Sequence, residues 1–311
     1  MQQRNTKARH SEEPVVVSIG WLAKWIGAVV AAALVCVYLA MCLLFYQGQW
    51  QLVFHPSHVV DRTPASIGLN YDNVRFDADE TGHLQLSGWW IPAEANAKYE
   101  HATMLLCHDN VGSVSDTLGL ASQIHSLGIN VFAFDYHGFG SSDWAKPSES
   151  LIYADTNAAV EYLTGTRHID SAQLALYGEG MGAAACAYAS AARPVGAVIF
   201  VNPVASMLPV AVMETQTRFV PLRLLFRDRL ELQPFLQARS PKLFIKLLTP
   251  PPDKATGRPI PTMNYSSDVH SLFLEAADPK MYWEEPPPTD ARSTHVSTVL
   301  SRFLDEYLPS K

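Results

Sequence analysis

The stretch Leu176–Ala183 has the sequence LYGEGMGA, and it fits the nucleophile-elbow pattern G-x-S-x-G at every position but one. In that motif a buried strand ends at a sharp turn, the turn presents a serine, and a helix starts directly afterwards. Residues 173–177 are typical of a buried strand, and the small residues of 181–192 predict a helix that packs close to a sheet. The place of the serine is taken by Gly180, so the sequence predicts the turn without its attacking oxygen.

Apolar runs alternate with helical stretches through most of the chain, which predicts a parallel sheet covered by helices on both faces. We therefore predict an α/β fold whose functional loops lie at the carboxyl ends of the strands. Residues 203–238 interrupt this alternation and are predicted to form a small helical cap. The expected strands are 73–76, 84–91, 102–106, 130–134, 173–177, 197–201, 242–246 and 281–283. The expected helices are 115–127, 151–164, 181–192 and 295–307.

The N-terminal part of the chain predicts a membrane anchor. Residues 25–46 contain no charged side chain, and as a helix they would extend about 33 Å, enough to cross a bilayer. We predict a cytoplasmic tail over 1–24, a transmembrane helix over 25–46, a juxtamembrane connector over 47–70, and a main domain over 71–311. A cleaved signal peptide is the alternative, although the apolar stretch is long and no A-x-A site ends it.

The distribution of charge predicts the orientation of this anchor and excludes one class of partner. Basic residues precede the apolar stretch, which places the N-terminus in the cytoplasm and the main domain on the periplasmic, extracellular or lumenal side. They are Arg4, Lys7, Arg9 and Lys24. The net charge of −7 is spread thinly over 311 residues. The sequence contains no cluster of basic residues, so it gives no indication of a nucleic-acid partner.

Neither the histidines nor the cysteines have the spacing of a metal site, and no cofactor motif is present. Cys107 and Cys186 fall in the predicted core, where cysteine is most often a buried free thiol. A disulfide between them would be allowed outside the cytoplasm, so both alternatives remain open.

Three loops occur in the order and spacing of a known family. Residues 107–112 read CHDNVG, residues 135–142 read DYHGFGSS, and the elbow follows. They resemble the HGNAGN-like, DYRGYGKS-like and GxSxGG loops of the α/β-hydrolase superfamily, in particular of its membrane-anchored serine hydrolase branch, which is similar to serine aminopeptidases. The resemblance extends over residues 48–308 and implies an α/β-hydrolase fold with a mostly parallel sheet and a helical cap.

The resemblance also assigns expected roles around the elbow. Gly180 stands at the nucleophile position, between Gly178 and Glu179 on one side and Met181 and Gly182 on the other. The oxyanion hole would be formed by the backbone N–H of Met181 and by a second N–H near His108 or Asp109.

Asp109 replaces a residue that is usually glycine in this family. If its carboxylate lies beside the oxyanion hole, it would repel a developing negative charge. The alternative is that it points outward as a loop residue.

The remaining triad members are weakly indicated. The family places an acid soon after the strand 242–246, where Asp253 is a candidate, and a histidine after the last strand, where His295 is a candidate base. A surface loop aspartate and a histidine at a helix N-terminus are the alternatives.

Our leading hypothesis is a single-pass membrane protein with an impaired hydrolase domain that binds a small acyl or lipid ligand or a protein partner. The alternatives are an active esterase, lipase or peptidase with a non-standard nucleophile, and a membrane scaffold protein.

Overall fold

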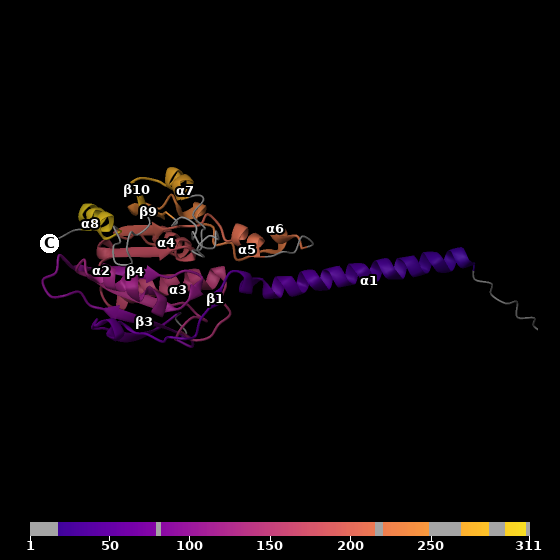
Figure 1. Cartoon of the computed structure of the whole chain (residues 1–311), viewed down its shortest axis with the longest axis horizontal. Coiled ribbons are helices and arrows are strands. Elements are labelled where there is room, and N and C mark those ends of the chain that lie inside the picture. The colour runs from indigo at the N-terminus through magenta and orange to yellow at the C-terminus, as the bar shows by residue number, and fades with distance from the viewer. Residues whose placement is uncertain (1–17, 79–81, 215–219, 249–268, 286–295, 309–311) are drawn as a thin grey trace, which may run out of the picture. The chain divides into compact units, whose positions relative to one another are not determined.

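The computed structural model describes residues 18–78, 82–214, 220–248, 269–285 and 296–308 (Figure 1). The chain divides into two compact units, Met1–Gln47 and Gly48–Lys311.

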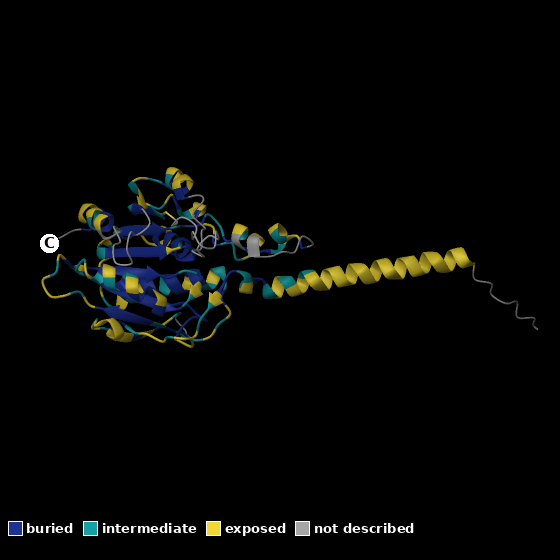
Figure 2. Cartoon of the chain, in the orientation of Figure 1, coloured by how far each residue is buried: buried dark blue, intermediate teal, exposed yellow. Residues whose placement is uncertain are grey.

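In its described residues the first unit consists of one long helix, α1 (Ile19–Gly48), which has no buried residue and is exposed over most of its length (Figure 2). Its most apolar 18-residue window has a mean hydropathy of 2.7. A long helix with apolar residues on all sides is typical of a membrane span. At about 1.5 Å per residue, it is longer than the hydrocarbon core of a bilayer. Its length and hydropathy therefore suit a single-pass anchor, as expected for residues 25–46.

The second unit is built on an eight-stranded sheet with the order β10-β9-β8-β7-β4-β6-β3-β2. The pairs β2–β3 and β3–β6 are antiparallel, and all other neighbours are parallel. Strand β7 therefore lies near the middle, between β4 and β8. The strands are β2 (Asp72–Asp77), β3 (Gln85–Ile91), β4 (Tyr99–Cys107), β6 (Ile129–Asp135), β7 (Leu174–Glu179), β8 (Ala197–Val201), β9 (Lys242–Leu247) and β10 (Lys280–Glu285).

Helices cover both faces of this sheet because its central strands carry mostly apolar, buried side chains on both faces. Helices α2 (Leu118–His125) and α8 (Val296–Tyr307) pack into one hydrophobic cluster, while α3 (Glu149–Glu161) and α4 (Met181–Ala192) pack into the other. The smaller elements are α7 (Val269–Glu275), the 3-10 helices η3 (Val114–Thr117) and η5 (Ser171–Gln173), and the π-helical turn η4 (Tyr162–Thr166). The predicted α/β-hydrolase fold is confirmed.

The segment that follows α1 is an integral part of the second unit. It contains the 3-10 helices η1 (Gln49–Leu52) and η2 (Pro64–Ile67) and a two-residue strand, β1 (His55–Pro56). Val53 and Phe54 between them are buried in the core. Strand β1 pairs in parallel with β5 (Val111–Gly112), which lies in the loop after β4.

The predicted cap contains short helical pieces in its described parts. These are α5 (Leu208–Glu214), α6 (Leu222–Leu225) and the 3-10 turn η6 (Gln233–Phe235). The carboxylate of Glu149 accepts a hydrogen bond from Leu230 N–H (2.9 Å), and Asp228 accepts one from Glu149 N–H (2.9 Å). These two bonds attach the end of the cap to the start of α3.

Every strand and helix expected from the sequence is present within a few residues of its predicted bounds. The two short strands of the second sheet, β1 and β5, are not expected from the sequence. Cys107 and Cys186 are both buried free thiols and form no disulfide with each other.

Candidate functional site

The elbow keeps the backbone conformation of a strained turn although no serine is present. Gly180 has φ 53° and ψ −114°, outside the regions that L residues adopt without cost. Its N–H donates to the carbonyl of Val201 on the neighbouring strand (3.1 Å). Glycine relaxes the strain at this position because it has no Cβ.

The flanking glycines are explained by close packing. A Cβ on Gly182 would collide with the carbonyl of Cys107 at the end of β4, and a Cβ on Gly178 would collide with the backbone of α4. The first turn of α4 therefore packs directly against β4 and β7, which brings the loop after β4 next to the elbow.

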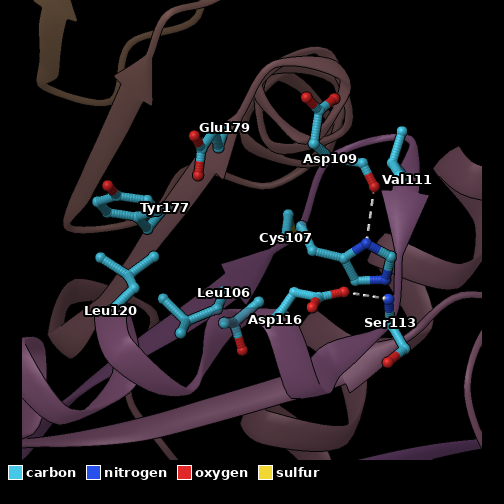
Figure 3. A pocket seen from close by; sticks show the side chains of 11 residues that line it. Leu106, Cys107, Asp109, Val111, Ser113, Asp116, Leu120, Tyr177 and Glu179 are labelled. Carbon is cyan, nitrogen blue, oxygen red and sulfur yellow. Dashed lines mark hydrogen bonds between the residues drawn. The ribbon is translucent and has the colours of Figure 1, made fainter. Parts of the chain in front are cut away.

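The carboxylate of Asp109 points toward the elbow, so the outward orientation does not occur (Figure 3). Its Oδ1 atom accepts hydrogen bonds from the backbone N–H of Met181 (2.8 Å) and from the backbone N–H of Asn110 (2.8 Å). All three atoms of the carboxyl group lie too close to Gly180 for any Cβ to be placed there. The Asp109 carboxylate thus fills the space of the absent side chain and binds the N–H that was predicted to stabilise an oxyanion.

The loop that carries Asp109 is held by the segment after α1. The N–H of His55 donates to the carbonyl of Asn110 (2.8 Å), and the N–H of Ser57 donates to the carbonyl of Gly112 (2.8 Å). The side-chain amide of Asn110, which is buried, donates to the carbonyl of Val53. These bonds form the β1–β5 ladder and fix the position of the loop.

His108 is buried as a neutral imidazole beneath this loop. Its Nδ1 lies 2.7 Å from the carbonyl oxygen of Asp109, to which it donates, and burial lowers its pKa to about 4. Its Nε2 is buried without a hydrogen-bond partner and lies 3.9 Å from the carboxylate of Asp135. Tyr136 donates to the carbonyl of His108 (3.3 Å). His108 is therefore fixed by its surroundings and supports the loop.

A cavity of about 170 Å³ lies beside the elbow, and both Asp109 and Glu179 line it (Figure 3). Partial desolvation of its carboxyl group, together with the charge of Asp109, raises the pKa of Glu179 to about 7, although the residue as a whole is exposed to solvent. Burial also raises the pKa of Asp109, against the effect of its two backbone hydrogen bonds. The cavity is small compared with the roughly 300–1,000 Å³ of usual ligand pockets.

Sequence analysis missed a buried histidine–aspartate pair at the end of β6. Asp155 on α3 accepts hydrogen bonds from the backbone N–H of His137 (2.8 Å) and from its Nδ1 (2.6 Å). Burial raises the pKa of Asp155, while the bonds to His137 oppose this effect. Both side chains are almost fully buried, which makes the pair a clamp between the loop after β6 and α3. His137 stands in the DYHGFGSS loop, but nothing in the sequence links it to Asp155, which lies 18 residues further along the chain.

Two predicted triad candidates, Asp253 and His295, lie outside the described residues. Among the residues that the structure describes, no group of three or more His, Cys, Asp or Glu side chains could hold a metal ion.

Comparison with known proteins supports the relationship suggested by the loops. Residues 98–248 match the sequence model of the serine aminopeptidase family S33. The uncharacterized protein Rv2307c of Mycobacterium tuberculosis is 29% identical over 199 residues, which cover 64% of this chain and 68% of that protein. The α/β-hydrolase domain-containing protein WAV2 of Arabidopsis thaliana is 29% identical over 152 residues, which cover 48% of each chain. Four further relatives, at 31–34% identity, are matched over 39–50% of their own length.

Solved structures share the same architecture at low sequence identity. The esterase Pf2001 of Pyrococcus furiosus superimposes with a TM-score of 0.59 at 15% identity, over 83% of this chain and 99% of that one. A serine hydrolase without a lid from Xanthomonas campestris superimposes with a TM-score of 0.51 at 18% identity, over 78% and 97%. The order of the sheet, the elbow and the loops after β4 and β6 agree with these matches: the chain has the α/β-hydrolase fold, and its residues 98–248 are similar to the serine aminopeptidase family S33.

Proposed function

We propose that this chain is a membrane-anchored α/β-hydrolase-fold protein that has lost serine-hydrolase catalysis and binds an acyl or lipid ligand, or a protein partner, through its domain. The observation that carries this proposal is the hydrogen bond from Met181 N–H to the Asp109 carboxylate, beside a glycine at the nucleophile position. The site thus holds a carboxyl group at the place where the reaction of the family needs to create an anion.

Two physical effects support a loss of catalysis. Loss of a triad nucleophile costs on the order of a million-fold in rate. In addition, a carboxylate near the position of the oxyanion would oppose the charge of the tetrahedral intermediate, because two like charges about 4 Å apart repel by about 4 kcal/mol at an effective dielectric constant of 20. If the N–H of Met181 were not bonded to Asp109, it could donate to the oxyanion and stabilise that charge.

The alternative of an active hydrolase with a non-standard nucleophile requires another attacking side chain. His108, the histidine nearest to Asp109 in the chain, is neutral, with its Nδ1 bonded to a backbone carbonyl. Glu179 lies at the cavity, but it is a carboxyl group with a raised pKa next to another carboxylate. Neither side chain has the environment of an activated nucleophile–base pair.

The test is covalent labelling of the full-length protein with a fluorophosphonate probe, which reacts with activated serines. We expect no specific labelling, with an active serine hydrolase in the same lipid preparation as the positive control. The matched variant is Asp109→Asn, which keeps the shape of the side chain and removes its charge, and we expect it to remain unlabelled. Specific labelling of the wild-type domain would overturn the proposal.

A further inference from the structure

Large exposed apolar side chains are found at the end of the domain that carries η1. Leu224 on α6 is 82% exposed, and Trp144 in the loop after β6 is 57% exposed. The ring of Trp144 contacts the ring of Trp50 in η1 with a centroid distance of 6.4 Å, and that of His58 at 5.5 Å. A single exposed apolar side chain is normal on a protein surface, so what distinguishes these two is where each is held in the domain.

The part of the cap that follows α6 is hydrogen-bonded to η1. Gln49, which is buried, accepts a hydrogen bond through its side-chain oxygen from the backbone N–H of Arg227 (2.8 Å). Arg227 follows α6 by two residues, and the guanidinium of Arg229 donates to the carbonyl of Arg223 within α6 (2.7 Å). These contacts keep α6 near η1, and Figure 1 shows α5, α6 and β1 at one end of the domain.

Chain connectivity brings this end of the domain close to the end of the anchor. Gln49 follows Gly48, the last residue of α1, and Trp50 is the second residue after it. Since one residue spans at most about 3.6 Å, Trp50 lies within roughly 7 Å of the end of α1 at any angle between the two units. Trp144 contacts Trp50, and Arg227 contacts Gln49, so both belong to the part of the domain nearest to the point where the chain leaves its apolar helix.

We propose that Leu224 at the tip of α6 and Trp144 dock on the surface of the lipid bilayer that α1 crosses. Tryptophan is enriched at the membrane interface, where its ring bridges apolar and polar layers, and leucine would enter the acyl boundary. Arg223 on α6 is exposed and would meet lipid phosphates. The anchor keeps Leu224 and Trp144 at a high effective concentration near the membrane, so a few contacts with lipid are enough for docking.

This inference rests on the membrane anchor of the proposed function and is independent of whether the domain catalyses a reaction. It commits to lipid as the partner. A protein that covers the same two side chains is the alternative that the experiment distinguishes.

The test uses the full chain in nanodiscs of phosphatidylcholine and phosphatidylglycerol. The photoreactive residue benzoylphenylalanine replaces Leu224 in one variant and Trp144 in another, and lipid adducts are quantified by mass spectrometry after irradiation. The matched control is the same replacement at Leu274 on α7, which is 61% exposed and lies away from η1 in sequence and fold. All three positions are exposed, so the fold is expected to survive, and the melting temperature checks this.

We expect severalfold more lipid adducts at positions 224 and 144 than at position 274. Equal yields at the three positions would overturn the proposal, as would adducts at 224 and 144 with protein alone in native membranes. A chain that does not incorporate into nanodiscs would overturn both the docking and the anchor. Fluorophosphonate labelling would overturn only the loss of catalysis.

Discussion

The carboxyl group of Asp109 occupies the space in which a side chain of residue 180 would begin. The two residues meet because β4 and β7 are neighbours and Cys107 pairs with Gly178 at their ends. A glycine at position 180 gives the carboxylate room, and the carboxylate in turn binds the N–H of Met181. The two departures from the family pattern are therefore one geometric change, so a substitution at either position has consequences at the other.

Replacing Gly180 by serine is expected to destabilise the domain without creating activity. A non-glycine residue at φ 53° and ψ −114° costs about 1–3 kcal/mol, and the new Cβ would also collide with Asp109. We therefore expect the Gly180→Ser variant to lose at least about 1–3 kcal/mol of unfolding free energy, measured by urea denaturation in detergent. Hydrolysis of p-nitrophenyl acetate should remain at the level of the wild type.

The double variant Gly180→Ser with Asp109→Gly separates the two contributions. It removes the collision and frees the N–H of Met181, so we expect it to recover part of the lost stability. If the single variant Gly180→Ser is as stable as the double variant, Asp109 does not occupy this space in solution.

The stability of the domain should depend on pH through Glu179. Its pKa in the folded chain, about 7, lies above its ordinary value of 4.5, because burial and the Asp109 charge disfavour the carboxylate. Folding thus favours the protonated form, and this contribution to stability is fully present below about pH 4.5 and lost as the pH rises through 7. We expect the melting temperature of Glu179→Gln, relative to wild type, to increase between pH 4.5 and 7 and then to level off.

Glu284 provides a control of opposite sign for this measurement. The hydrogen bond from Tyr282 lowers the pKa of Glu284, so its carboxylate is favoured by folding. The variant Glu284→Gln should show no relative gain in melting temperature over the same pH range. A pH-independent difference for Glu179→Gln would contradict the raised pKa.

The buried pair of His137 and Asp155 should be one of the main polar contributions to stability. The variant Asp155→Ala leaves two N–H donors of His137 without an acceptor in the core. Loss of one partner from a buried pair costs about 3–5 kcal/mol of unfolding free energy. Urea denaturation measures this loss. The exposed ion pair of Arg75 and Asp143 is the comparison, and Arg75→Ala should cost about 1 kcal/mol or less.

The orientation in the membrane can be measured at a single introduced thiol. Cys107 and Cys186 are buried in the domain, and Cys36 and Cys42 lie within α1, where a bilayer would shield them from an impermeant reagent, so the four native thiols should not react. A cysteine that replaces the exposed Leu274 is expected to react with a membrane-impermeant maleimide on intact cells, because the basic N-terminal tail favours the cytoplasm. A cysteine at position 5 should react only after the cells are permeabilised. The reverse result would place the domain in the cytoplasm.

The sequence was informative where local pattern determines structure. Continuous apolar runs predicted β4, β6, β7 and β8, and the glycines around position 180 predicted the elbow, because each depends on neighbours in the chain. The direction of Asp109 could not be derived in this way. It depends on the distance between two loops that only the register of β4 and β7 brings together.

The same limit applies to the other unexpected contacts. A ladder of two residues, as between His55 and Val111, leaves no periodic signal in the sequence, so residues 47–70 were expected to form only a connector. The bond between His137 and Asp155 joins a loop to a helix, and neither residue type is distinctive alone. The roles of Asp253 as the acid and of His295 as the base remain predictions.

The ladder between β1 and β5 determines how a soluble version of the domain has to be designed. His55 and Ser57 bond the loop that carries Asp109, and the buried Val53 and Phe54 immediately precede them. A truncation that starts after residue 57 would delete, along with the anchor, the strand that holds the loop lining the pocket. Binding or activity assays on such a shortened protein would then describe a damaged site, whereas a truncation at Gly48 would keep the pocket intact.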